Sequence, residues 1–160
     1  MIRVKYFSFG LLLAAALVCA GLFHVELSRA DDVTFSRGSV SIDTSTGVEL
    51  FDVEIAITSQ QRGRGLMERD FLARDEGMLF LYDTERMVSM WMKNTLIPLD
   101  MLFVDDDGIV RHIARETEPL SLDVISSTVP VIAVLEIPGG VAQDLGIAVG
   151  DRVAYERVSQ

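Results

Sequence analysis

An alternation of apolar and polar side chains begins shortly after residue 40. Between residues 48 and 58, Phe51, Val53 and Ile55 fall on one side of an extended chain, and the intervening acidic residues fall on the other. A period of two predicts a half-buried β-strand. The tripeptide Ser-Thr-Gly before this segment has the composition of a turn, so residues 40–44 are expected to form the partner strand of a β-hairpin.

Short apolar runs bounded by polar or turn residues continue along the chain, and such runs are typical of core strands. The tetrapeptide Asp-Asp-Asp-Gly at residues 105–108 predicts a tight hairpin turn. A calcium loop is the alternative there, but the further acidic ligands and the closing glutamate that it needs are absent. The strands are expected over residues 78–82, 87–92, 99–104, 129–137 and 151–158.

Helices are expected to be few and short. Thr58 or Ser59 can cap a short helix whose last turn is weakened by two glycines, and residues 141–145 form one further helical turn. Residues 117–128 are interpreted as a surface loop. This pattern predicts a mainly β fold, either an antiparallel β-sandwich or a distorted barrel with one or two short helices. No alternation of strands and helices indicates a parallel sheet.

The first thirty residues have the composition of a cleavable signal peptide. Arg3 and Lys5 precede an apolar run over residues 7–23, and small side chains at Ser28 and Ala30 form the expected cleavage junction. An uncleaved membrane anchor is the alternative, because the apolar run approaches the length that spans a bilayer. We therefore expect an exported protein of the periplasm or cell envelope.

Cleavage near Ala30 leaves residues 31–160, a length that suits one β domain with its core over about residues 48–158. Cys19 is the one cysteine of the chain and lies within the predicted signal peptide. The exported part is therefore expected to contain neither a disulfide nor a reactive thiol.

The negative net charge of the chain limits the kinds of partner that it is expected to bind. The chain has a formal charge of −10, and loss of three cationic side chains and one anionic side chain with the signal peptide changes it to −12. Such a surface repels phosphate backbones and anionic lipid. Nucleic acid is not expected as a partner, and membrane contact is expected only through the N-terminal segment if it stays uncleaved. Nothing in the pattern indicates an oligomeric state.

A candidate ligand cleft surrounds the one tryptophan of the chain. Alternation places Trp91 and Lys93 on the same face of a predicted strand. A buried lysine is costly without a partner, so Lys93 is expected to reach water or to pair with Asp100 or Glu136. A tryptophan that caps the core beside a structural ion pair is the alternative. The candidate ligand-binding residues are Trp91, Lys93, Asn94, Asp100, Arg64 and Glu136, and sugar or peptidoglycan fragments would suit them.

Arg64 lies beside a second arginine and two glycines. One interpretation is a small anion site, because guanidinium groups and successive backbone N–H groups both favour anions. The stronger interpretation in so acidic a protein is an internal ion pair with Asp70, Asp100 or Glu136.

No metal and no cofactor are expected. Six methionines fall between residues 67 and 101, and Met90 with Met92 could present two thioethers to Cu(I). Methionine more commonly fills irregular cores, and that interpretation is preferred here. His112 is the one histidine after the signal peptide, so no set of zinc ligands is available.

Several motifs resemble, in order, those of the domain of unknown function 192 family. The longest of them is the unusual block Trp-Met-Lys-Asn-Thr-Leu-Ile-Pro-Leu-Asp. The resemblance covers about residues 50–155 and rests on residues 64–67 with Arg69, 77–80, 91–100, 135–136 with Gly140, and 150–153.

The resemblance implies a compact, mainly β, sandwich-like domain of bacteria and archaea that often follows an export signal. The family is named for the absence of an assigned activity, so no catalytic residue, cofactor or ligand comes with it. Two features depart from the family pattern. Met90 stands where an aromatic residue is usual, and residues 117–131 lack the tyrosine or cysteines found in many members.

Three functions are compared. The leading hypothesis is a binding or accessory module of the periplasm or cell envelope. The second is an enzyme acting on an envelope polymer, in which Lys93 works with Asp100 or Glu136 as an acid–base pair. The third is an adapter whose apolar surface is covered by a protein partner.

Overall fold

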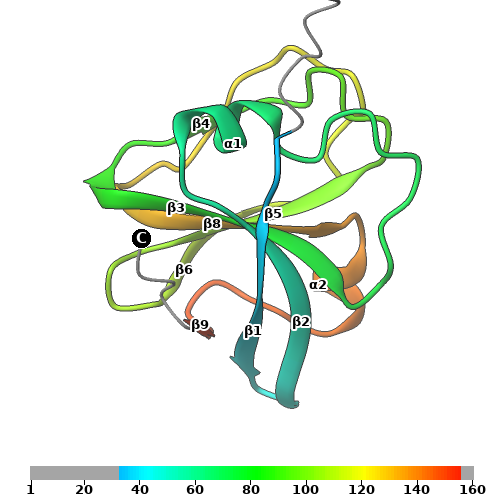
Figure 1. Cartoon of the computed structure of the whole chain (residues 1–160). Helices are drawn as coiled ribbons and strands as arrows, with labels where there is room; N and C mark the ends of the chain where they lie inside the picture. The colour runs from blue at the N-terminus through cyan, green and yellow to red at the C-terminus, as the bar shows by residue number, and fades with distance from the viewer. Residues whose placement is uncertain (1–32, 156–160) are drawn as a thin grey trace, which may run out of the picture. The chain divides into compact units, whose positions relative to one another are not determined.

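A curled β-sheet dominates the computed structural model, which describes residues 33–155 (Figure 1). The predicted signal peptide lies outside the described residues. Within residues 33–155, no helix has the length and apolar character needed to cross a bilayer.

The described chain contains nine strands and two short helices. In chain order these are β1 (Ser36–Thr44), β2 (Gly47–Ala56), α1 (Ser59–Arg64), β3 (Glu76–Arg86), β4 (Ser89–Met90), β5 (Leu99–Val104), β6 (Val110–Ala114), β7 (Ile125–Ser126), β8 (Val131–Pro138), α2 (Val141–Asp144) and β9 (Arg152–Tyr155).

Seven of the strands form one sheet in the order β6-β5-β8-β3-β2-β1-β9, and β4 pairs with β7 in a separate ribbon. The predicted hairpin is confirmed, since β1 and β2 pair antiparallel up to Thr44 opposite Gly47. The pair β2–β3 is parallel, in contrast to the other pairs of the large sheet. The sequence pattern did not indicate this pairing, because the crossover between the two strands contains only the six-residue helix α1.

The two ends of the large sheet approach each other. Ile109, just before β6, forms an isolated antiparallel bridge with Arg152 of β9. The amide of Val110 donates to the carbonyl of Asp151 at 3.0 Å, and the amide of Val153 donates to the carbonyl of Gly108 at 2.7 Å. These bonds join the edge strands, so the predicted mainly β fold with barrel-like curvature and short helices is confirmed.

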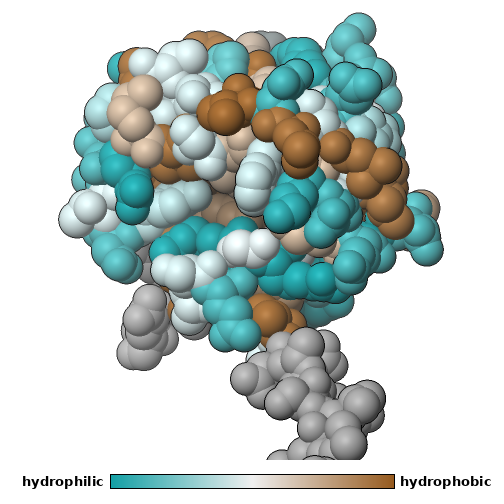
Figure 2. Space-filling view, turned by 90° about the horizontal axis from the view of Figure 1, so that it is seen from above, coloured by the Kyte–Doolittle hydropathy of each residue, from teal (hydrophilic) through white to brown (hydrophobic). Residues whose placement is uncertain are grey.

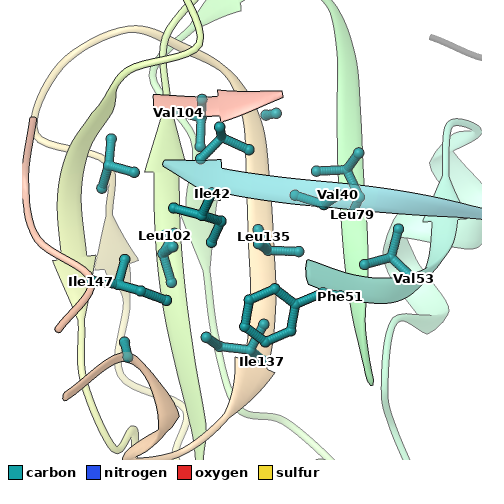
Figure 3. Packing of buried hydrophobic residues seen from close by; sticks show 14 of the residues in the cluster. Val40, Ile42, Phe51, Val53, Leu79, Leu102, Val104, Leu135, Ile137 and Ile147 are labelled. Carbon is teal, nitrogen blue, oxygen red and sulfur yellow. The ribbon is translucent and has the colours of Figure 1, made fainter. Parts of the chain in front are cut away.

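Period-two alternation along the central strands divides the core into two clusters. Leu79 of β3 and Leu135 of β8 point into the first, together with side chains from β1, β2 and β5 (Figure 3). Their neighbours Phe80 and Val134 point into the second. The second cluster therefore lies on the opposite face of these strands, where the chain that follows α1 and the segments that carry β4 and β7 contribute to it.

The strand predicted over residues 87–92 is shorter than expected. Only β4 pairs as a strand, and beyond it the amide of Met92 donates to the carbonyl of Ser121 at 3.1 Å. Asn94 then has a φ of 56°, which extended backbone does not allow. After β4 the segment therefore continues as irregular chain and forms no further strand before β5.

Candidate functional site

A pocket of about 80 Å³ opens where α1 and the β4 segment meet above the strands β3 and β8. α1 begins at Thr58, whose hydroxyl accepts from the Gln61 amide while the Gln61 side chain bonds back to the Thr58 amide. This capping box fixes the helix start and with it the position of the helix end. The pocket is lined by Arg62, Gly63, Arg64, Gly65, Leu66, Met67, Phe80, Ser89, Met90, Trp91, Thr95 and Glu136.

Glu136 is the acidic group of this pocket. It lies two residues before the end of β8, whose other residues are apolar, and only 4 % of its surface is exposed. Burial raises the pKa of its carboxyl group to about 8. Its side chain makes no hydrogen bond or ion pair with any of the residues 33–155, so its polar atoms are available to the pocket.

Trp91 stands half exposed at the mouth of the pocket, with 49 % of its surface accessible. The Nζ atom of Lys93 lies 5.1 Å from the centroid of its ring. The two side chains therefore lie on the same side of the chain, as predicted. Lys93 is exposed and does not pair with Asp100 or Glu136. Lys93 does not line the pocket.

Two arginines of α1 contribute to the wall, and both already have protein partners. Arg62 donates through Nη1 to the carbonyls of Ile57 and Leu81, and its guanidinium stacks over Tyr82 at 5.0 Å. Arg64 forms an ion pair with Glu68 at 2.9 Å. The predicted internal ion pair of Arg64 with Asp70, Asp100 or Glu136 is therefore not formed, and Arg64 pairs at the surface with a glutamate four residues on.

At the end of α1, the backbone of Gly65 forms part of the pocket wall. Gly65 has a φ of 48°, and a Cβ atom there would lie 3.3 Å from Cζ of Phe80. A side chain at this position would meet both backbone strain and a crowded ring. Glycine therefore lets the chain pass close to Phe80 and keeps the pocket open.

A second, wider hollow of about 420 Å³ adjoins the pocket. The two share Arg64, Gly65 and Met67, so they meet at the end of α1. On its far side this hollow is lined by Phe35 and by Arg69, which forms an ion pair with Glu54.

Two of the predicted site residues lie elsewhere. Asp100 is fully buried, and its carboxylate accepts from the amides of Glu116 at 2.7 Å and Ala142 at 2.8 Å. It ties α2 and the chain after β6 to β5, so its position indicates a structural role. Asn94 does not line the pocket, although its side-chain amide lies 4.0 Å from the sulfur of Met67. The pocket therefore brings together Arg64, Trp91 and Glu136 and leaves out Lys93, Asn94 and Asp100.

The enzyme hypothesis needed Lys93 and a carboxylate in one pocket. Asp100 is engaged by backbone amides, and Lys93 faces the indole ring of Trp91. The proposed acid–base pair is therefore not assembled in this structure.

The apolar contribution of Leu66, Met67 and Phe80 to the pocket was not expected from sequence. These residues have the same apolar pattern as any core residue, so period alone does not distinguish a pocket wall from a packed interior. Glu136 could be recognised from the sequence, because it is the one charged residue within the apolar run of β8.

Exposed apolar side chains accompany the pocket on the same face. They come from the β4 segment and from the loop before β7, which are joined by hydrogen bonds from Met92 to Ser121 and from Leu120 to Thr95. Figure 2 shows brown groups crossing this face among hydrophilic ones. The apolar patch consists of Trp91, Leu96, Leu120, Leu122 and Val124.

Among residues 33–155 no group of three or more His, Cys, Asp or Glu side chains is arranged to hold a metal ion. The two methionines of the copper alternative do not act together. Met92 is buried and its sulfur accepts from the Thr117 hydroxyl at 3.1 Å, whereas Met90 lines the pocket.

Comparison with known families and structures gives consistent results. A family model described as "Uncharacterized ACR" (DUF192) matches residues 40–155. A crystal structure from Sinorhizobium meliloti 1021, carrying the provisional description of a transcription regulator, is 42% identical with a TM-score of 0.75. The alignment covers 78% of this chain and 97% of that one.

A second crystal structure, of a protein of unknown function from Novosphingobium aromaticivorans DSM 12444, is 38% identical with a TM-score of 0.72. The alignment covers 79% of this chain and 89% of that one. Comparison with curated proteins yields no significant match.

Proposed function

The chain belongs to the domain of unknown function 192 family, and from this premise we propose that it is a binding or accessory module of the periplasm or cell envelope. Its ligand enters the pocket beside α1. The proposed location rests on the composition of residues 1 to 30, in which a basic start precedes an apolar run and a small-residue junction.

The observation that carries the proposal is the state of Glu136. A buried carboxyl group without a hydrogen-bond partner costs free energy, and a protein that needed only a stable core would place an apolar side chain there. The group instead lines a pocket under the half-exposed ring of Trp91. The pocket combines apolar side chains with the polar groups of Ser89, Thr95 and Glu136, and a concave site in which polar groups converge is a usual form of small-molecule site.

The charge of the chain supports a ligand other than nucleic acid. One structural relative has the provisional description of a transcription regulator. This chain has a formal charge of −10, so the phosphate backbone of a nucleic acid would meet overall repulsion. The two pocket arginines are engaged by protein groups and do not alter that balance.

Fluorescence of the single tryptophan tests the proposal. Soluble fragments of cell-envelope glycans and peptides are titrated into the purified protein, and at least one is expected to change Trp91 emission saturably. Glu136→Met should abolish that change, whereas Val149→Ala, an exposed site that lines neither hollow, should leave it intact. Saturable binding that persists unaltered in Glu136→Met would refute the pocket assignment.

The apolar patch favours the adapter as a second candidate. Five large side chains exposed on one face exceed the scattered apolar residues that a soluble surface normally shows. Analytical ultracentrifugation of the purified protein with candidate envelope partners tests it, with Leu122→Glu as the patch variant. The adapter requires a complex that Leu122→Glu dissociates and that Glu136→Met retains.

A further inference from the structure

The size of the pocket limits what enters it. Its volume of about 80 Å³ is well below the roughly 300–1,000 Å³ of sites that enclose a drug-sized ligand. One functional group therefore fits inside, and the remainder of any larger ligand lies across the mouth.

Glu136 offers that group a neutral carboxylic acid. Because burial raises the pKa of the side chain to about 8, it holds its proton at neutral pH. A protonated carboxyl donates one hydrogen bond through O–H and accepts others through its carbonyl oxygen. The complementary ligand group has an acceptor for that O–H and carries no charge of its own.

Charged groups fit the wall less well. An anion would have to displace the two carbonyls bonded to Arg62, or to compete with Glu68, which pairs with Arg64 at the surface. A cation would need Glu136 to ionise in its buried position and would then lie beside both guanidinium groups. A neutral polar group avoids both penalties.

Part of the wall is apolar, beside the polar side chains of Ser89 and Thr95. Leu66 and Phe80 are buried core residues, and the thioether side chains of Met67 and Met90 complete this part. An acetamido group has both features that the pocket requires. Its carbonyl oxygen accepts a hydrogen bond from the Glu136 O–H, and its methyl group occupies apolar space.

The surroundings of the mouth fit a sugar. Trp91 presents half of its surface there, and an indole ring offers a flat apolar face on which a pyranose ring can lie. The wider hollow shares Arg64, Gly65 and Met67 with the pocket, and its volume of about 420 Å³ leaves room for a further unit. A polymer can thus place one side group in the pocket and its neighbouring unit in the hollow.

We propose that the ligand is an N-acetylated glycan, with one acetamido group held by Glu136 and its sugar ring lying against Trp91. This inference rests on the proposed function and specifies the ligand class of the same pocket.

Two matched trisaccharides test the ligand class by isothermal titration calorimetry. Tri-N-acetylchitotriose and cellotriose have the same backbone and differ at C2, where the first has an acetamido group and the second a hydroxyl. The acetylated trimer should bind at least about tenfold more tightly, because it gains one hydrogen bond and one buried methyl group.

Variants at Glu136 assign the preference to the pocket. Glu136→Met should remove the difference between the trimers, Glu136→Gln should retain part of it because the amide still hydrogen-bonds, and Val149→Ala should keep all of it. Equal affinity for the two trimers, a preference that survives in Glu136→Met, or no binding of either trimer overturns the inference.

These outcomes are separable from failure of the proposed function. If neither trimer binds and another envelope fragment still changes Trp91 emission in a manner that depends on Glu136, the ligand class is wrong and the binding function stands. If no fragment of any class does so, both are refuted.

Discussion

At the scale of single residues, Glu136 is a buried carboxyl group that costs stability, and the proposed ligand site gives a reason for its presence. It lies in an apolar strand, is almost completely buried, and has no hydrogen-bond partner in residues 33–155. Asp100 is the instructive contrast, because its buried carboxylate accepts two backbone amides and holds three segments together. Two buried acids in adjacent strands therefore have different roles, which their hydrogen bonds reveal.

Replacement of Glu136 by an apolar side chain of similar size should stabilise the protein. Glu136→Met removes the cost of desolvating a carboxyl group that no protein donor compensates, and we expect the free energy of unfolding at neutral pH to rise by about 1–3 kcal/mol. Urea denaturation followed by circular dichroism measures this. A loss of stability of similar size would show that Glu136 makes a structural contact and would remove the basis of the proposed site.

The same carboxyl group should make stability depend on pH. In the unfolded chain it ionises near its usual pKa of 4.5, while in the folded protein burial holds the pKa at about 8. Between these values the folded state binds one more proton, so the free energy of unfolding falls as pH rises, by up to roughly 1.4 kcal/mol per pH unit.

Glu136→Gln cannot ionise, so its free energy of unfolding should lack this contribution to the pH dependence. The difference in unfolding free energy between wild type and variant, measured across the same pH range, isolates it from all other titrating groups. Parallel curves for the two proteins would mean that the pKa of Glu136 is not raised.

The residues of the pocket are only partly predictable from the sequence. Trp91, Arg64 and Glu136 were expected together and do line one pocket, whereas Asp100 was expected with them and is buried elsewhere. Residue type and strand alternation predict which side chains share a face. They do not predict which of two carboxyl groups finds backbone donors, because the donors of Asp100 come from segments distant in the chain.

At the scale of elements, the site depends on close contact between β3 and β8. Gly77 belongs to β3 and lies beside the backbone of β8. A Cβ atom at Gly77 would stand 2.6 Å from the backbone carbonyl oxygen of Glu136. The strand that carries Glu136 thus has its position set by a residue without a side chain.

Gly77→Ala should therefore destabilise the protein, by about 1–3 kcal/mol, since backbone must move to accommodate the methyl group. Gly63→Ala is the matched control, because it lies in α1 with nothing within 4 Å of the added atom and should be neutral or stabilising. Thermal unfolding of both variants checks this. Equal effects would show that the β3–β8 contact does not exclude a side chain.

Regular elements were predictable wherever a period was long enough to recognise. The alternation around Val53 predicted β2 and its hairpin with β1, and the apolar run at residues 99–104 coincides with β5. The parallel pairing of β2 with β3 was not predictable. Its crossover contains one helix of six residues, and most of its length has no period that indicates where the chain returns.

At the scale of the whole molecule, the acidity of the chain and its predicted signal peptide are the two features on which the proposed location rests. The formal charge of −10 favours solubility and disfavours anionic partners, while the composition of residues 1 to 30 favours export. An envelope module that binds a neutral glycan is compatible with both features.

Export is tested by fractionating cells that express the full chain and sequencing the N-terminus of the recovered protein. We expect the protein in the periplasmic or envelope fraction, starting at Asp31. Recovery from the cytosol with Met1 or Ile2 as the first residue would contradict the proposed location and would leave the pocket argument unchanged.

The central claim is that a ligand group enters the pocket above Glu136, and methionine methyl NMR tests it most directly. Met67 and Met90 line the pocket, whereas Met87 is exposed but outside it and Met101 is buried in the core. With ¹³C-methyl methionine labelling, titration of tri-N-acetylchitotriose or an active envelope fragment should shift the Met67 and Met90 signals saturably and leave those of Met87 and Met101 in place. Saturable shifts confined to Met87, with Met67 and Met90 unmoved, would contradict the account.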